Sequence, residues 1–478
     1  MTFFSRLNPV PSFPAYSGPY KVGTFDYEVP VHELSKSISP PDPAITTIRF
    51  RLFYPCERET GKIKPLHWLP EPQGEHLRAF YRFCQATPWL ATLLSHLCGS
   101  LASHGLVVVA PEHRDGSAPI SIIKETTKSK GVPIHYKTLA HQPTPEVEEG
   151  RNEQLRIRCW ELALVHHALL EIDVGRALTN TRTPGASTEV ASHFQGRLDV
   201  HTPGRIAWAG HSFGATTTVQ FIKSIFHGGS HLLKVPPESQ LSKQITPSSS
   251  ISLLDLWAMP LFPQSSSLWA KRLPAFSAKS SQSASPPLAI LSEGFYKWSS
   301  NLRQTILAIS GPESSSIKPW ISYPVKSAHL SQSDFGILFP WLTKKALKVE
   351  EPERTLKLNV RAILESLRRN DIEVADTSQI DMETADELEQ KEHTALGTTM
   401  MGQDHKILAA DGGIRGWIAI DPDQELQKRS VTLSRTTTTA NGDANIKTPN
   451  GSVANGSVTK VKAEGGPGQQ AMKKEMSD

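Results

Sequence analysis

The chain has 478 residues, enough for one large domain with additional segments. Its hydrophobic content of 38% is low for a globular protein, which indicates that part of the sequence lies outside any core. A formal net charge of +4 gives no reason to expect a nucleic-acid partner.

The sequence shows no signal for export or for a membrane span. Its beginning contains no continuous apolar segment of the length found in signal peptides, and Thr2 excludes N-myristoylation. No stretch approaches the roughly 20 apolar residues of a transmembrane helix. The cysteines show no metal-ligand spacing, so we interpret them as reduced thiols: Cys56, Cys84, Cys98 and Cys159. We therefore expect a soluble cytoplasmic protein, with a peripheral position at membranes as the alternative.

The first half of the chain alternates between predicted strands and helices. Residues 45–55 (ITTIRFRLFYP) and 106–113 (LVVVAPEH) are rich in β-branched and apolar residues, which is typical of strands. Apolar residues recur at helical spacing in 75–101 and in 150–180. The second of these segments predicts a long amphipathic helix.

The second half continues this alternation and predicts the fold class. A short strand, 205–209, is followed by a helix from Ala215 onward. Three strand-like runs and a last amphipathic helix follow at about 251–257, 287–292, 321–325 and 353–370. Strands that alternate with helices predict an α/β protein, with a mainly parallel sheet and helices on both faces.

Composition divides the chain into a folded domain, 1–374, and a tail, 375–478. Ser/Pro-rich insertions at about 234–250 and 262–287 predict mobile surface loops within the domain. The tail is too polar to bury the apolar area that would offset its ordering entropy. We therefore expect a disordered low-complexity tail, except for a short segment around Trp417.

The junction between the strand at 205–209 and the next helix reads Gly210-His211-Ser212-Phe213-Gly214. This G-x-S-x-G pattern between a strand and a helix is typical of a nucleophile elbow, in which a serine occupies a strained turn. Such a turn requires neighbours without bulk, which predicts the two glycines. It also directs the amide of Phe213 toward a developing oxyanion. The sequence therefore predicts Ser212 as a nucleophile.

A nucleophilic serine needs a base and an orienting acid, which follow it in the order acid, then histidine. Of the downstream histidines, His393 and His405 fall in the tail, so His329 is the candidate base. Asp255, at the end of an apolar run, is the first candidate for the acid. Glu293 also follows a strand-like run and competes with it, while Glu238 and Glu313 lie in Pro/Ser-rich loops.

Several separate segments resemble the platelet-activating factor acetylhydrolases of the plasma and intracellular isoform II type, in a fungal version. The segments occur in the order of that family between about residues 18 and 370. They read SLASHGLVVVAPEHRDGSAP, GRNEQLRIR, AGHSFGA, LDLWAMPLF and AHLSQSDF. The resemblance implies an α/β-hydrolase fold.

The resemblance also implies a calcium-independent, phospholipase A2-like serine esterase that needs no metal or organic cofactor. Its substrate would be a phospholipid, a 1-alkyl-2-acetylglycerophosphocholine or one with a short or oxidised sn-2 acyl group. By this resemblance Ser212 is the nucleophile, His329 the general base and then acid, and Asp255 the orienting acid in preference to Glu293.

One part of the family pattern is absent. Members carry an apolar strand and a loop of the type F-S-H-G-L-G-G before the helix that reads SHLCGSLASHG here, and that loop donates the second oxyanion amide. In this chain 87–105 contains neither. We therefore expect a sheet that lacks one central strand, and we hypothesise that the chain is an incomplete family member joined near Leu94 and Ser95.

This departure keeps two alternatives open: a catalytically impaired interaction protein, or a general short-chain carboxylesterase. Other segments leave smaller questions. An apolar stripe predicts either a lipid-facing surface or core: Phe80, Phe83, Trp89, Leu90 and Leu94. His113, Arg114 and Asp115 predict either residues that line the site or a structural turn. The glycines of HGGS, 227–230, indicate a turn or a helix cap.

Overall fold

The computed structural model describes residues 13–34, 38–56, 72–86, 94–126, 128–183, 187–261, 268–278, 284–347, 352–377 and 418–428. These residues form two larger sheets and a hairpin. The first sheet is antiparallel, in the order β1 (Lys21–Pro30), β2 (Thr47–Cys56) and β3 (Val108–Glu112). The hairpin joins β4 (Ile120–Ile123) to β5 (Val132–His135).

The second sheet is mainly parallel, as the alternation of strands and helices predicts. Its order is β10 (Ile418–Ala419), β9 (Trp320–Tyr323), β8 (Leu288–Ile290), β7 (Ile251–Leu254) and β6 (Trp208–His211). Strands β6 to β9 are parallel, and β10 pairs antiparallel with β9. The register sets His211 opposite Leu254 and Leu254 opposite Ile290. The residues that follow these strands therefore meet at one edge.

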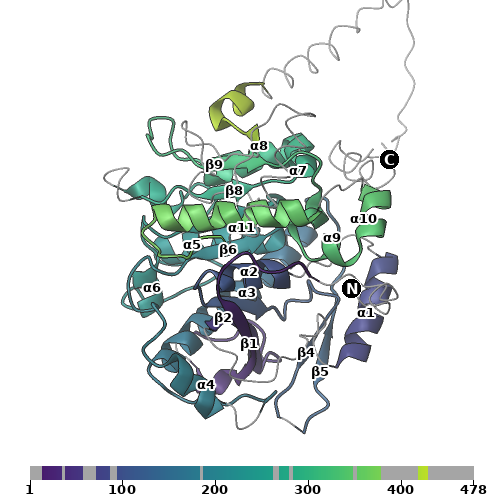
Figure 1. Ribbon diagram of the computed structural model, residues 1–478, viewed down its shortest axis with the longest axis vertical. Coiled ribbons are helices and arrows are strands. Elements are labelled where there is room, and N and C mark those ends of the chain that lie inside the picture. The colour runs from purple at the N-terminus through teal and green to yellow at the C-terminus, as the bar shows by residue number, and fades with distance from the viewer. Residues whose placement is uncertain are drawn as a thin grey trace, which may run out of the picture.

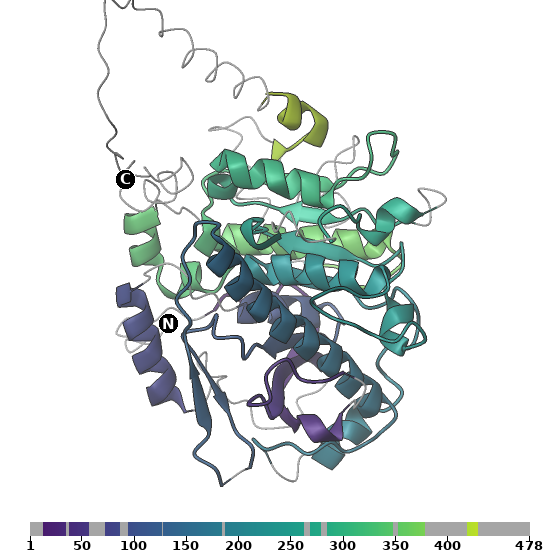
Figure 2. The same ribbon diagram turned by 180° about the vertical axis from the view of Figure 1, so that it is seen from behind.

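Helices cover both faces of this arrangement (Figures 1 and 2). On one face lie α2 (Ser95–Ser103) and α11 (Pro352–Arg369), whose leucines pack on β7 and β8. On the other face lie α3 (Pro145–Asp173), α5 (Phe213–Phe226) and α8 (Ser299–Ile309). The remaining helices are α1 (Gln73–Ala86), α4 (Ser187–Phe194), α6 (Gln240–Gln244), α7 (Glu293–Lys297), α9 (Phe335–Leu338) and α10 (Pro340–Leu347). Short 3₁₀ turns span Val31–Glu33, Met259–Leu261, Pro274–Ser277 and His329–Gln332.

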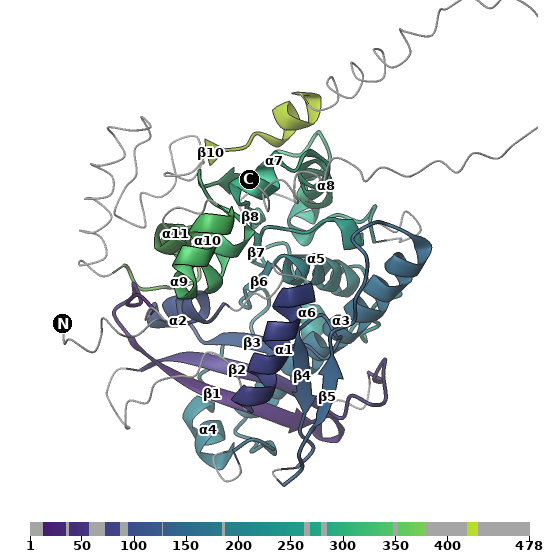
Figure 3. The same ribbon diagram turned by 90° about the vertical axis from the view of Figure 1, so that its right-hand side faces the viewer.

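The two larger sheets do not join in the described part of the chain. There β3 pairs only with β2 and β6 only with β7, although β3 comes next to β6 in the series of strands in Figure 3. Every residue of β3 is half-buried and Ala209 in β6 is exposed, whereas all of β7 and β8 is buried. The central strand that we expect to be missing would lie between β3 and β6. Its loss stays a prediction.

One segment expected to form a mobile surface loop is structured instead. The insertion at 234–250 contains α6, and Val235, Leu241 and Ile245 are buried in the same core as α5. Its apolar residues are few, but each faces that core. Within the second insertion the described residues 268–278 also bury Leu268 and Leu273, while 262–267 and 279–283 lie outside the described residues.

The tail contributes to the second sheet at the segment around Trp417. Residues 418 and 419 form β10, and Ile420 is buried against the core. The other residues between 378 and 478, apart from 420–428, lie outside the described residues, so the expected disorder stays a prediction. None of the described helices has both the length and the apolar character that a bilayer crossing requires.

Candidate active site

Ser212 occupies the strained turn that the sequence predicts. Strand β6 ends at His211 and α5 begins at Phe213, and Ser212 between them has φ 55° and ψ −119°. A non-glycine residue in this region costs on the order of 1–3 kcal/mol and persists only where its surroundings impose it. The side chain is half-buried at the edge where the parallel strands end.

The two glycines of the elbow are not equivalent. A Cβ on Gly210 would lie 2.4 Å from the backbone carbon and oxygen of Gly214, so no side chain fits there. A Cβ on Gly214 would meet only the Arg158 guanidinium, at 3.9 Å. The expectation that both glycines are sterically required is therefore wrong for Gly214.

Asp255 follows β7 and lies beside the elbow. Its side chain is fully buried and its φ is 44°. The Ser212 amide donates to the carbonyl of Leu254 at 2.9 Å, which sets the serine next to the residue before Asp255. The Ser292 amide donates to Asp255 Oδ1 at 2.5 Å, so one carboxylate oxygen is held by the end of β8.

His329 completes an imidazole–carboxylate pair with Asp255. It begins the 3₁₀ turn after β9, its Nδ1 lies 2.9 Å from Asp255 Oδ2, and its side chain is 18% exposed. A carboxylate at Nδ1 favours the tautomer with the proton on that atom, which leaves Nε2 free to accept a proton. The structure thus brings together the predicted acid and base across 74 residues of sequence.

Two rings hold the imidazole of His329 between them. The His211 ring stacks on one side, with centroids 4.5 Å apart, and the Phe295 ring on the other, at 4.7 Å. His211 is buried, and this burial holds the pKa of its ring well below the ordinary value, so it is neutral. Because His211 directly precedes Ser212, this stack connects the elbow to the imidazole.

Ser212 Oγ itself makes no hydrogen bond to His329 in the described structure. The serine and the imidazole are brought near each other by the His211 stack and by the strand register. Hydrogen bonds of catalytic groups are often long before substrate binds and shorten in the complex.

Glu293, the competing acid, is engaged elsewhere. Its side chain pairs with Lys297 Nζ at 2.7 Å and accepts a hydrogen bond from the amide of Lys326. These contacts anchor α7 to the loop before His329. The local geometry therefore favours Asp255 as the partner of His329.

Phe213, the candidate oxyanion donor, is flanked by two arginines of α3. Its amide lies in the first turn of α5, where helix amides have no intrahelical partner. Arg158 and Arg151 lie over its ring, with Cζ 4.7 and 5.5 Å from the centroid. Arg158 also pairs with Asp115 at 3.3 Å and donates to Thr217 Oγ1 at 2.7 Å. These contacts attach α5 to α3 and to the loop after β3.

The turn after β3 is a structural anchor, which agrees with one of the two readings of its sequence. His113 Nδ1 lies 2.6 Å from Glu161 Oε2 on α3, and Asp115 pairs with Arg158. Burial raises the pKa of Glu161 to about 8 and holds the pKa of His113 well below its ordinary value. Burial therefore disfavours the charged form of both partners.

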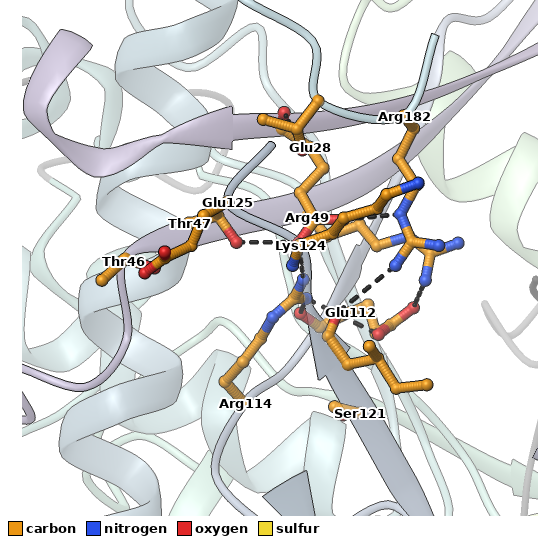
Figure 4. A network of polar contacts seen from close by, with 12 residues as sticks. Glu28, Thr46, Thr47, Arg49, Glu112, Arg114, Ser121, Lys124, Glu125 and Arg182 are labelled. Carbon is orange, nitrogen blue, oxygen red and sulfur yellow. Dashed lines mark hydrogen bonds and ion pairs between the residues drawn. The ribbon is translucent and has the colours of Figure 1, made fainter. Parts of the chain in front are cut away.

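Arg114 enters a buried network of charges that joins the first sheet to the loops around it (Figure 4). Its guanidinium lies 3.1 Å from Glu28 Oε1, and both side chains are fully buried. Glu28 also binds Arg182, Thr47 Oγ1 and the amide of Lys124. Close by, Arg49 pairs with Glu112 at 2.7 Å.

Sequence reasoning missed several residues of the site. Asp334, five residues after His329, accepts hydrogen bonds from the amides of Ser95 and His96 and so caps α2. The stacked rings of His211 and Phe295 were also missed. The signal for Asp334 was its place in the motif AHLSQSDF, whereas the stack depends on register and carries no signal in the sequence.

The structure also bears on two further predictions, the turn at HGGS and the apolar stripe. His227 ends α5, and Gly228 and Gly229 have φ of 75° and 109°, so HGGS forms a turn after that helix. Of the predicted apolar stripe, the side chains of Phe80 and Phe83 and both Trp89 and Leu90 lie outside the described residues; Leu94 packs against the core beside α11. On α1 the exposed large apolar residues are Leu77 and Tyr81.

Comparisons with known proteins agree with the sequence motifs. The family described as "Platelet-activating factor acetylhydrolase, isoform II" matches residues 88–391. A fission yeast (Schizosaccharomyces pombe) protein named "Putative phospholipase A2" is 24% identical over 429 residues, which cover 75% of this chain and 92% of that protein. Platelet-activating factor acetylhydrolases of cattle (Bos taurus) and dog (Canis lupus familiaris) are 35% and 31% identical, each over 27% of this chain and 28% of their own.

The family match covers more than half of the chain and includes the elbow, Asp255 and His329. The family implies an α/β-hydrolase fold, and the described structure has the mixed sheets and flanking helices that such a fold requires. The chain belongs to the isoform II family of platelet-activating factor acetylhydrolases.

Proposed function

We propose that this chain is a serine esterase that hydrolyses the sn-2 acyl ester of glycerophospholipids. The observation that carries the proposal is the meeting of a strained serine with a histidine–aspartate pair at one sheet edge. Family membership and the names of the relatives support a phospholipid as the substrate.

The proposed mechanism has two steps. Ser212 attacks the ester carbonyl while His329 Nε2 takes its proton, and Asp255 stabilises the resulting imidazolium. The amide of Phe213 donates to the oxyanion. His329 then gives the proton to the departing lysophospholipid, and water hydrolyses the acyl-serine by the reverse sequence of proton transfers. The proposed mechanism assigns every proton transfer and the oxyanion contact to groups of the chain itself, so calcium independence is part of the proposal. Activity in the presence of a calcium chelator tests it.

Arg151 supports a phosphate-bearing substrate. It is only 5% exposed, its Nη1 donates to Gln154 Oε1 at 2.8 Å, and its Nε has no partner within the described ranges. Its Cζ lies 4.9 Å from the centroid of the Trp257 ring, two residues after Asp255. A buried cation without a carboxylate partner is costly, and a phosphodiester bound at its side would offset that cost.

Labelling with a fluorophosphonate probe tests the nucleophile. The wild-type chain is expected to be labelled, Ser212→Ala is not, and Ser192→Ala on the exposed face of α4 serves as the matched control. Absence of labelling in a folded wild-type chain would refute the esterase. It would support the second candidate, an inactive interaction protein, which the break between β3 and β6 favours.

The choice of substrate is tested by comparing an acetyl-phospholipid with a soluble acetate ester. We expect a higher kcat/KM for the phospholipid, and Arg151→Met should lower that preference by about 10- to 100-fold, the value of a charged hydrogen bond. Arg156→Met is the control, because Arg156 pairs with Glu149 on the surface of the same helix. Equal kcat/KM for both esters would identify a general carboxylesterase instead.

A further inference from the structure

His211 is a buried side chain without a hydrogen-bond partner. It is 6% exposed, and neither Nδ1 nor Nε2 has a partner among the residues that the structure describes. The proposed hydrolysis assigns it no proton to transfer. Two unsatisfied ring nitrogens in a buried place cost free energy, and a ligand that accepts a lone pair would satisfy one of them.

The residues around His211 have the composition of a metal site. One ligand atom each of His211, Asp255 and His329 lies within 4.8 Å of the other two. Two imidazoles and one carboxylate are ligands that Zn²⁺ takes in three-ligand sites, with water in the fourth position. Metal–ligand bonds of about 2.0–2.2 Å in a tetrahedral site would set these atoms roughly 3.3–3.6 Å from one another. The Asp255 and His329 atoms would move apart slightly from 2.9 Å, and the His211 ring would rotate out of its stack on His329 to direct a nitrogen at the ion.

We infer that His211, Asp255 and His329 form an inhibitory Zn²⁺ site. The ion binds His329 Nδ1 and Asp255 Oδ2, which already lie 2.9 Å apart, and one ring nitrogen of His211. The proton of Nδ1 moves to Nε2 of the same ring, and the hydrogen bond between Nδ1 and Oδ2 breaks. Three coordination bonds to the chain replace bonds to water ligands of the hydrated ion, which are released, and the number of bound protons does not change. Nε2 then carries a proton and can no longer accept one from Ser212.

The donor set makes the site selective among divalent ions. Imidazole nitrogens suit Zn²⁺, Co²⁺ and Cu²⁺, whereas Ca²⁺ and Mg²⁺ require mainly oxygen ligands. Of the three proposed ligands only Asp255 offers oxygen, and its Oδ1 already accepts from the Ser292 amide. The inhibition rests on the proposed esterase, but the binding of zinc does not.

Competition with a chromophoric zinc chelator tests the binding on the full chain. We expect one Zn²⁺ per chain for the wild type and for His201→Gln, because His201 is 48% exposed and pairs with Asp173 away from the site. His211→Gln should bind more weakly by about tenfold or more, since the loss of even an outer partner of a ligand costs 10- to 100-fold. Unchanged affinity in His211→Gln overturns the proposal.

A second measurement keeps the test valid if His211→Gln does not fold. Asp255→Asn removes a different ligand and should also lose zinc, and nitrogen NMR of His329 in the wild type should report transfer of the proton from Nδ1 to Nε2 on addition of Zn²⁺. A ring that keeps its Nδ1 proton at saturating zinc contradicts the site. Zinc should also slow fluorophosphonate labelling of Ser212; a chain that binds zinc but is never labelled would refute the esterase alone.

Discussion

Two carboxylates, Asp255 and Glu293, follow buried strands near the candidate base, and their surroundings differ. Among the described residues the Asp255 carboxylate has hydrogen bonds with the imidazole and with one backbone amide, whereas Glu293 pairs with Lys297. If Asp255 orients His329, then Asp255→Asn should lower kcat by about 10⁴-fold, because the amide stabilises the wrong tautomer. Glu293→Gln should change kcat by no more than a few-fold. Steady-state hydrolysis of one ester by both variants measures this, and a larger loss in Glu293→Gln would exchange their roles.

Lys223 on α5 is a buried amine that weakens the fold. It is 2% exposed and lies 5.9 Å from the Trp269 ring, and burial lowers the pKa of its amine to about 7. The folded chain therefore binds fewer protons than the unfolded chain between pH 7 and 10.5, so this residue makes stability fall as the pH decreases through that range.

Lys223→Met should remove this penalty. We expect a gain on the order of 2–4 kcal/mol in the free energy of unfolding at pH 7. At pH 10 the gain should be much smaller, because the amine of the unfolded chain then also loses part of its charge. Urea unfolding of wild type and variant at the two pH values measures it. An equal gain in stability at pH 7 and pH 10 would mean that the effect comes from packing and not from the charge of Lys223.

At the scale of elements, the first sheet depends on charges that its strands bury. Glu28 of β1 is fully buried and binds both Arg114 and Arg182. Glu28→Gln keeps the shape but removes the charge, so two buried guanidiniums lose the carboxylate that they share, although Arg114 still lies 3.6 Å from Glu112. We expect a loss of about 3–5 kcal/mol. The exposed Glu149→Gln, which breaks the pair with Arg156, should cost about 1 kcal/mol or less. Urea unfolding measures the free energy of unfolding of both variants. Similar losses in Glu28→Gln and Glu149→Gln would contradict this account.

The same residues show how far sequence reasoning reaches. The strands at 106–113 and 251–257 and the long helix at 150–180 were predicted because their apolar residues repeat at a clear period, and β3, β7 and α3 confirm them. Strand β1 was missed because it carries Asp26 and Glu28, acids that are rare in strands, and their arginine partners lie far away in sequence. The hairpin of β4 and β5 was missed as well.

For the site, chain order alone selected His329 and Asp255, which the structure brings together at 2.9 Å. Order could not select the rings that hold His329, because His211 and Phe295 meet it only through strand register. Nor could composition predict that the insertion at 234–250 packs on the core. Its Ser/Pro content is typical of a mobile loop, but three of its apolar residues are buried. The catalytic roles themselves stay predictions.

At the scale of the whole molecule, helices rather than strands connect the two sheets: α2 packs on β2 and on α11, and α3 packs on β2 and on α5. We predict the effect of an insertion placed directly before Ser95. It consists of about four or five β-branched residues, roughly the length of β3 and β6, followed by a loop of the type F-S-H-G-L-G-G. The inserted strand should pair with β3 on one side and with β6 on the other. It should raise the rate of fluorophosphonate labelling by about 10²–10³-fold through a second oxyanion donor.

The control for this insertion is a Gly/Ser segment of equal length, which can neither pair nor position an amide. The strand should also raise the melting temperature, because it covers the half-buried β3 and the exposed Ala209. Equal labelling rates and equal melting temperatures for the two insertions would contradict the prediction.

Strand β10 has a consequence for solubility. By pairing with β9, residues 418 and 419 occupy the outer border of the parallel sheet, where unpaired amides and carbonyls otherwise recruit strands from other molecules. A chain shortened to end before residue 418 would leave the backbone of Ile321, Ser322 and Tyr323 without this partner strand. Light scattering should then detect concentration-dependent self-association that the chain with residues 418–428 does not show. On this account a segment of the tail protects the protein from aggregation.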